Sequence, residues 1–198
     1  MSRTQLRSGI AHVGQALRMP EDFAVAWNEG AVRYPWWVWL SLPLTAILGT
    51  TTYGMTMGLL GGASDVLAKG MACTLAAGLA WGIALPALYI LNSLSGAKLK
   101  ASSTLLAAMV TTSWGGLAMI ASIPINWFFS VAVPHPTTVL LVNLVVFAGV
   151  GVAMIDVFHR VMRRLEPRRG TAPTWWIALV GVIGAELFYF FGLFNFVS

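Results

Sequence analysis

The sequence predicts an all-α membrane protein, a polytopic helical bundle of about five transmembrane helices preceded by an amphipathic leader. The chain is 58% hydrophobic and only 10% charged, whereas soluble domains carry about 25% charged residues. Five apolar stretches follow one another, and about 20 helical residues suffice to cross a hydrocarbon core of ~30 Å. We expect a leader over residues 1–34 and one membrane domain over residues 35–198, with spans at 36–60, 70–94, 105–131, 139–158 and 175–197.

The basic residues predict the orientation of these spans. Eleven of the 12 Lys and Arg residues fall on one side of the predicted spans, and only Lys69 falls on the other. Because basic residues in short loops stay cytoplasmic, we expect a cytoplasmic N-terminus and an external C-terminus, with the protein integral to a bacterial inner membrane. The cluster between the last two spans would set the orientation of the protein or also contact anionic lipid headgroups. The attraction of each basic residue to such headgroups is worth ~1 kcal/mol. It contains Arg160, Arg163, Arg164, Arg168 and Arg169.

The cytoplasmic leader reads as one or two short helices. Pro20 suits the first turn of a second helix, and Gly30 can end it. We expect the leader to lie on the membrane surface, and docking to a partner protein is the alternative. The residues expected to face apolar material are Ile10, Leu17, Phe23 and Trp27.

The spans themselves carry aromatic and small residues in characteristic places. Tryptophans open the first and fifth spans at residues 36–39 and 175–176, and indole rings prefer the headgroup level. Two GxxxG pairs, Gly54 with Gly58 and Gly78 with Gly82, favour close helix packing in lipid. Prolines inside spans can kink their helices, and they are Pro43, Pro86 and Pro124.

Polar residues within the spans are the candidate functional residues. Glu186 lies eleven residues after Trp175, which puts it ~17 Å deep at 1.5 Å per residue. A charge there costs at least ~2.5 kcal/mol, and such a residue normally faces the bundle interior. We therefore expect Glu186 to be protonated and hydrogen-bonded between helices, or else to form a proton or cation site. Asp156 has Arg160 as its i+4 neighbour, which favours a local ion pair. Further polar candidates closer to the interfaces are Asn92, Asn126 and Asn143.

Enzymatic and cofactor-binding motifs are absent from the sequence. It contains no HExxH, paired CxxC, Walker or GxSxG motif. No disulfide can form within the chain, since Cys73 is its only cysteine. None of the three histidines is expected at mid-depth. We expect no catalytic residues, no metal, no cofactor and no nucleic-acid partner, so the protein should not be an enzyme.

The segment from Leu91 to Lys98 has the sequence LNSLSGAK, which is typical of a turn with small residues, a glycine and a basic residue. A helix of Ala, Leu and Gly follows at residues 104–124 and ends near Pro124. This arrangement resembles the Yip family of five-span membrane proteins, although Thr111-Thr112-Ser113-Trp114 stands where that family commonly has Gly-Tyr. The resemblance implies no catalytic residues. It implies action by association, because eukaryotic members act in vesicle trafficking and bind small GTPases and each other.

Three functions are compatible with these patterns. The first is a non-enzymatic, Yip-like scaffold that assembles with itself or with partners in the membrane, in contact with lipids. The second is an accessory transmembrane subunit of a respiratory, photosynthetic or secretory complex. The third is a small transporter or channel that uses Glu186.

Overall fold

The computed structural model describes residues 3–31, 34–94, 100–166 and 177–194, with side chains from residue 11 onward except that of Asn92. All regular structure within these ranges is helical. The helices are α1 (Arg3–Arg18), α2 (Pro20–Asn28), α3 (Trp36–Met57), α4 (Ala63–Leu94), α5 (Ala101–Ala132), α6 (Pro136–Leu165) and α7 (Ile177–Phe190).

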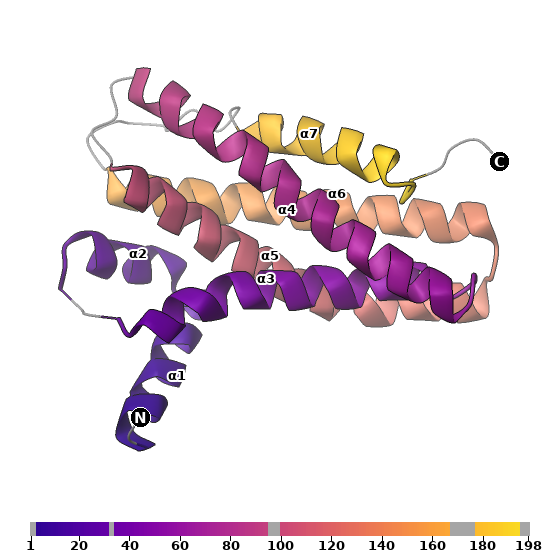
Figure 1. Ribbon diagram of the computed structural model, residues 1–198, viewed down its shortest axis with the longest axis horizontal. Coiled ribbons are helices and arrows are strands. Elements are labelled where there is room, and N and C mark those ends of the chain that lie inside the picture. The colour runs from indigo at the N-terminus through magenta and orange to yellow at the C-terminus, as the bar shows by residue number, and fades with distance from the viewer. Residues whose placement is uncertain (1–2, 32–33, 95–99, 167–176, 195–198) are drawn as a thin grey trace.

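Helices α3 to α7 run side by side in alternating directions, α2 folds against one end of the bundle, and α1 projects away from that end (Figure 1). Helix α3 packs against both α5 and α4, and α5 packs against α6. Helix α7 packs along α4. The bundle therefore has two parts, a layer of α3, α5 and α6 and a pair of α4 and α7, which are joined mainly through α3.

Three helices are long and apolar enough to cross a membrane by length and composition, and the prediction of five spans is corrected to three. The three segments are Ala63–Leu91 of α4, all of α5 and all of α6. They contain the second, third and fourth predicted spans, apart from the last residues of the second. Helices α3 and α7 lie along them in the same bundle.

The first and fifth predicted spans, which correspond to α3 and α7, are not among the three membrane-crossing helices because of their composition or their length. Helix α3 has 22 residues, but three tryptophans and five threonines lower its mean hydropathy. Helix α7 has 14 described residues, or about 21 Å of helix, and its chain turns at Gly192 with a φ of +66°. The outer parts of the fifth predicted span, 175–176 and 195–197, lie outside the described residues.

Helices α3 and α5 cross at glycines, where their backbones touch. A Cβ atom added to Gly49 would lie 2.1 Å from the carbonyl oxygen of Gly116. A Cβ atom added to Gly116 would lie 2.6 Å from the carbonyl oxygen of Thr45. No side chain fits at either position, so only glycine permits this crossing.

The two predicted GxxxG pairs have different outcomes. A Cβ atom on Gly54 would meet Cys73 of α4 at 2.6 Å, and one on Gly58 would meet Asp65 at the same distance. The first pair thus packs α3 against α4, as predicted. Gly78 and Gly82 have no atom within 4 Å of an added Cβ, so the second pair makes no close helix contact within this chain.

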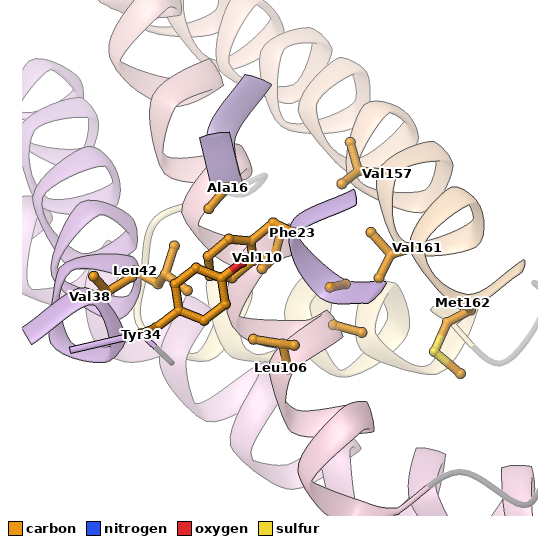
Figure 2. Packing of buried hydrophobic residues seen from close by; sticks show 12 residues of the cluster. Ala16, Phe23, Tyr34, Val38, Leu42, Leu106, Val110, Val157, Val161 and Met162 are labelled. Carbon is orange, nitrogen blue, oxygen red and sulfur yellow. The ribbon is translucent and has the colours of Figure 1, made fainter. Parts of the chain in front are cut away.

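Helix α2 and the C-terminal end of α1 contribute to the core of the protein. Phe23 of α2 is 2% exposed and packs with residues of α3, α5 and α6 (Figure 2). Trp27 lies edge-on to Trp39 with their ring centroids 4.2 Å apart. Helix α2 begins at Pro20, as the proline suggested, but its apolar face packs on the bundle instead of on lipid. The side chain of Ile10 lies outside the described part of the leader.

Gly49→Ala is expected to destabilise the bundle strongly. The new methyl group would overlap backbone atoms of α5, which cannot rotate away, so we expect a loss of about 3 kcal/mol or more, the upper part of the range for overpacked cores. Thermal or denaturant unfolding in detergent, followed by circular dichroism, measures this loss. Gly149→Ala in α6 is the matched control, because an added Cβ there has nothing within 4 Å. Equal stabilities of the two variants would contradict the α3–α5 crossing.

Candidate functional site: the outer face of helix α7

Glu186 lies level with the middle of a membrane-spanning helix. The closest approach of Gly184 in α7 is to Ala80 in α4, whose Cβ would be 3.8 Å from an added Cβ. Further along, the Lys69 ammonium group of α4 donates a hydrogen bond to the carbonyl group of Gly192. Since the two helices are antiparallel, Glu186 falls beside Gly78, near the middle of the span Ala63–Leu91.

The predicted direction of Glu186 is wrong. The side chain is exposed on the outside of α7 instead of facing the bundle interior. Within the described part of the chain it makes no hydrogen bond or ion pair, and neither of two hydroxyl residues of α5, Thr112 and Ser113, bonds to it. Thr112 donates to the carbonyl group of Met109, and the Ser113 hydroxyl is buried without a partner. The reason is that α7 packs on α4 through its opposite side, with Gly184 and Phe188 buried.

The residues around Glu186 on this side of α7 are aliphatic, apart from one tyrosine. One helical turn before it lies Val182, which is 62% exposed, and three residues after it lies Tyr189, which is 57% exposed. Ala178 and Ala185 are also exposed on this side. We call these five residues the α7 outer face. Within the described part of the chain, no group forms a hydrogen bond with the carboxyl group on this face.

Two of the predicted intramembrane asparagines hold α3 to its neighbours. Tyr53 donates its hydroxyl hydrogen to Oδ1 of Asn143 at 2.8 Å. Nδ2 of Asn126 donates to the hydroxyl oxygen of Thr56 at 2.7 Å. Both bonds lie near the end at which α3 finishes, and they link α3 to α6 and to α5. Such bonds in lipid contribute about 0.6–2 kcal/mol each, so these asparagines have a structural role. The side chain of the third, Asn92, is not described.

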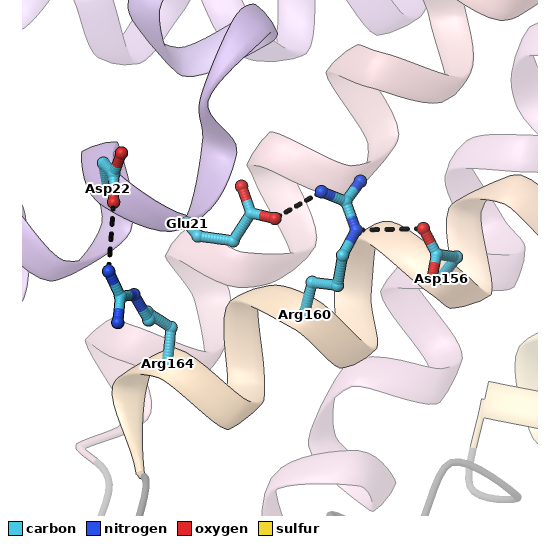
Figure 3. A network of polar contacts seen from close by, with 5 residues as sticks. All are labelled: Glu21, Asp22, Asp156, Arg160 and Arg164. Carbon is cyan, nitrogen blue, oxygen red and sulfur yellow. Dashed lines mark hydrogen bonds and ion pairs between the residues drawn. The ribbon is translucent and has the colours of Figure 1, made fainter.

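A charged network fastens α2 to α6 (Figure 3). Asp156 accepts a hydrogen bond from Nε of Arg160 at 2.9 Å, which confirms the predicted local ion pair. The same guanidinium group donates to Glu21 of the leader, and Arg164 forms an ion pair with Asp22 at 3.7 Å. Sequence reasoning missed the two contacts to the leader. The signal was available in the acidic pair that opens α2.

The basic cluster therefore has a second use besides orientation. Arg160 and Arg164 are engaged by the leader, while Arg163 is exposed on α6. Arg168 and Arg169 lie outside the described residues.

Other reactive groups form no assembled site in the described ranges. No group of three or more His, Cys, Asp or Glu residues that could hold a metal ion occurs there. Cys73 is fully buried between α4 and its neighbours. Tyr34 packs on Phe23 with ring centroids 4.5 Å apart, and its burial raises the pKa of its phenol.

Packing, more than charge, is expected to hold the leader in place. Phe23→Ala should weaken docking of α2 by about 3–5 kcal/mol, as for a buried phenylalanine. Arg160→Gln should cost only about 1 kcal/mol, because the ion pairs are partly exposed. Hydrogen–deuterium exchange of the α2 amides measures both effects. Met19→Ala, at a side chain that is 53% exposed, is the control. Faster exchange in Arg160→Gln than in Phe23→Ala would contradict this ranking.

Comparison of the chain with protein-family models, curated proteins and solved structures finds no match.

Proposed function

We propose that this protein works by assembly, and that it associates with a second copy of itself in the membrane through the α7 outer face. The observation that carries the proposal is the exposure of Glu186 level with the middle of the span of α4. The free energy of a polar side chain that points into hydrocarbon without a partner is unfavourable. Association removes this cost, and so it favours a complex over the single chain.

A second copy is a suitable partner because a protonated carboxyl group is both a donor and an acceptor. In a dimer with two-fold symmetry the same surface meets itself. The Glu186 side chains of the two copies would then hydrogen-bond to each other. Ala178, Val182 and Ala185 are short enough to let two α7 helices approach closely.

The other functions retain less support. A partner subunit with its own polar residue would satisfy Glu186 equally well, so the accessory-subunit hypothesis remains the second candidate. The resemblance to the Yip family favours association in either form. A transport path through Glu186 has less support, because Glu186 is not among the lining residues of the bundle's large cavity, whose walls are almost wholly apolar.

Cysteine cross-linking in vesicles tests the assembly. Val182→Cys should form a disulfide-linked dimer under mild oxidation, whereas Val145→Cys should not, although its side chain on α6 is 72% exposed. Adding Glu186→Leu should weaken the dimer by about 1–2 kcal/mol, or about 5- to 30-fold in its association constant. Adding Glu186→Gln, which retains a donor and an acceptor, should preserve it. Cross-linking that is equal at both cysteines, or unaffected by Glu186→Leu, would exclude this dimer.

We also propose that the basic end of the bundle faces the cytoplasm of a bacterial cell. Lys100 and Arg163 lie at one end, and His135 lies at the other. All three are exposed. An excess of basic residues marks the cytoplasmic side.

Accessibility of single cysteines tests this orientation. A membrane-impermeant maleimide applied to intact cells should label His135→Cys but neither Lys100→Cys nor Arg163→Cys, and permeabilised cells should show labelling of all three. The reverse pattern in intact cells would overturn the orientation.

A further inference from the structure

A large apolar cavity lies between the two parts of the bundle. Its volume is about 750 Å³, and residues of all five helices α3 to α7 line it. Few polar atoms reach it, and two of them, the hydroxyl groups of Thr50 and Thr74, have hydrogen-bond partners within the bundle. The volume is that of a typical small-molecule site, about 300–1,000 Å³.

The cavity exists because glycines from three helices face it without touching a neighbour. Gly78 of α4, Gly151 of α6 and Gly181 of α7 line the cavity, and a Cβ added to any of them would have nothing within 4 Å. They differ from Gly49 and Gly116, which are packed against backbone. Glycine at the first three positions therefore serves to keep space open rather than to bring helices together.

The cavity opens on the side of the bundle, toward the membrane. Along the bundle axis, pairs of aromatic side chains close it at both ends. Val152 of α6 and Gly181 of α7 line it and are exposed. Helices α6 and α7 pack mainly on α5 and on α4 instead of on each other, so we place the opening between α6 and α7. On one side Trp81 meets Phe158, with ring centroids 6.3 Å apart. On the other, Phe147 meets Phe188 at 4.6 Å and Phe194 at 5.4 Å.

These boundaries indicate what can fill the cavity. A transmembrane helix of a partner is about 10 Å wide and must continue to both membrane surfaces, which the two ring contacts between the helix layers obstruct. A hydrocarbon chain is thinner, enters from the side and can end blindly. A void left empty would forfeit dispersion contacts along its whole wall, while lipid chains are present at its opening.

We propose that the cavity binds an acyl chain of a membrane phospholipid. The chain would enter between α6 and α7 and lie against Gly78, Gly151 and Gly181. Glu186 itself does not line the cavity, whereas Ala185 of the α7 outer face does.

Photolabelling with a lipid probe tests the site. The full chain is reconstituted in phosphatidylcholine vesicles that contain a phosphatidylcholine with a diazirine on one acyl chain, irradiated, and mapped by mass spectrometry. Adducts on the cavity residues Ala77 and Ala148 are expected in the unaltered protein. Adducts on Leu141 and Val145, which are exposed on α6, provide the internal reference for ordinary lipid contact.

Two matched double variants decide the outcome. Gly78→Phe with Gly151→Phe fills the cavity and should reduce its adducts severalfold relative to the reference. The control pair, Gly82→Phe with Gly149→Phe, changes glycines that also have space for a side chain but do not line the cavity. In this control the adducts on the cavity residues should stay unchanged. The single variant Gly151→Phe, checked for folding by circular dichroism, replaces the first pair if that pair does not fold. An unlabelled cavity in the unaltered protein, or labelling that survives the filling variant, would overturn the proposal.

Discussion

The backbone contact between Gly49 of α3 and Gly116 of α5 is the constraint on which the rest of the bundle depends. Helix α3 is the main link between the layer that contains α5 and α6 and the pair formed by α4 and α7. Its distance from α5 therefore sets where α4 lies, and α4 in turn positions α7. Because the atoms in contact are backbone, the separation cannot adjust through side-chain rotation, and the crossing is fixed by the absence of two Cβ atoms.

Hydrogen bonds then fix the register of helices that glycine brings together. Thr51 and Thr74 join α3 to α4 with their hydroxyl oxygens 2.6 Å apart, and Tyr53 joins α3 to α6 through Asn143. In lipid, where apolar burial distinguishes poorly between neighbours, such directional contacts supply much of the specificity. The remaining apolar surfaces are free to diverge, and the cavity lies where α4 and α7 separate from α6.

The two proposed sites use opposite properties of α7. Its outer face presents a carboxyl group to hydrocarbon, which favours association with a polar partner. Its inner side contributes Gly181 and Gly184 to an apolar hollow, which favours a hydrocarbon chain. One short helix thus carries the face proposed for assembly and also forms one wall of the proposed lipid site. Its position depends mainly on α4, so both sites follow from how α4 packs on α3.

The sequence by itself determined the all-helical class of the protein and its apolar helices, because hydrophobic length is a local property, although three of the five predicted spans qualify as membrane-crossing. It also determined the ion pair of Asp156 with Arg160, which are four residues apart on one helix. The tertiary structure decided the direction of Glu186, since the buried side of α7 depends on which helix α7 packs against. It likewise decided that Gly54 is packed against α4 while Gly78 faces open space. The two glycines have the same GxxxG spacing, and the difference depends on whether another helix lies opposite them.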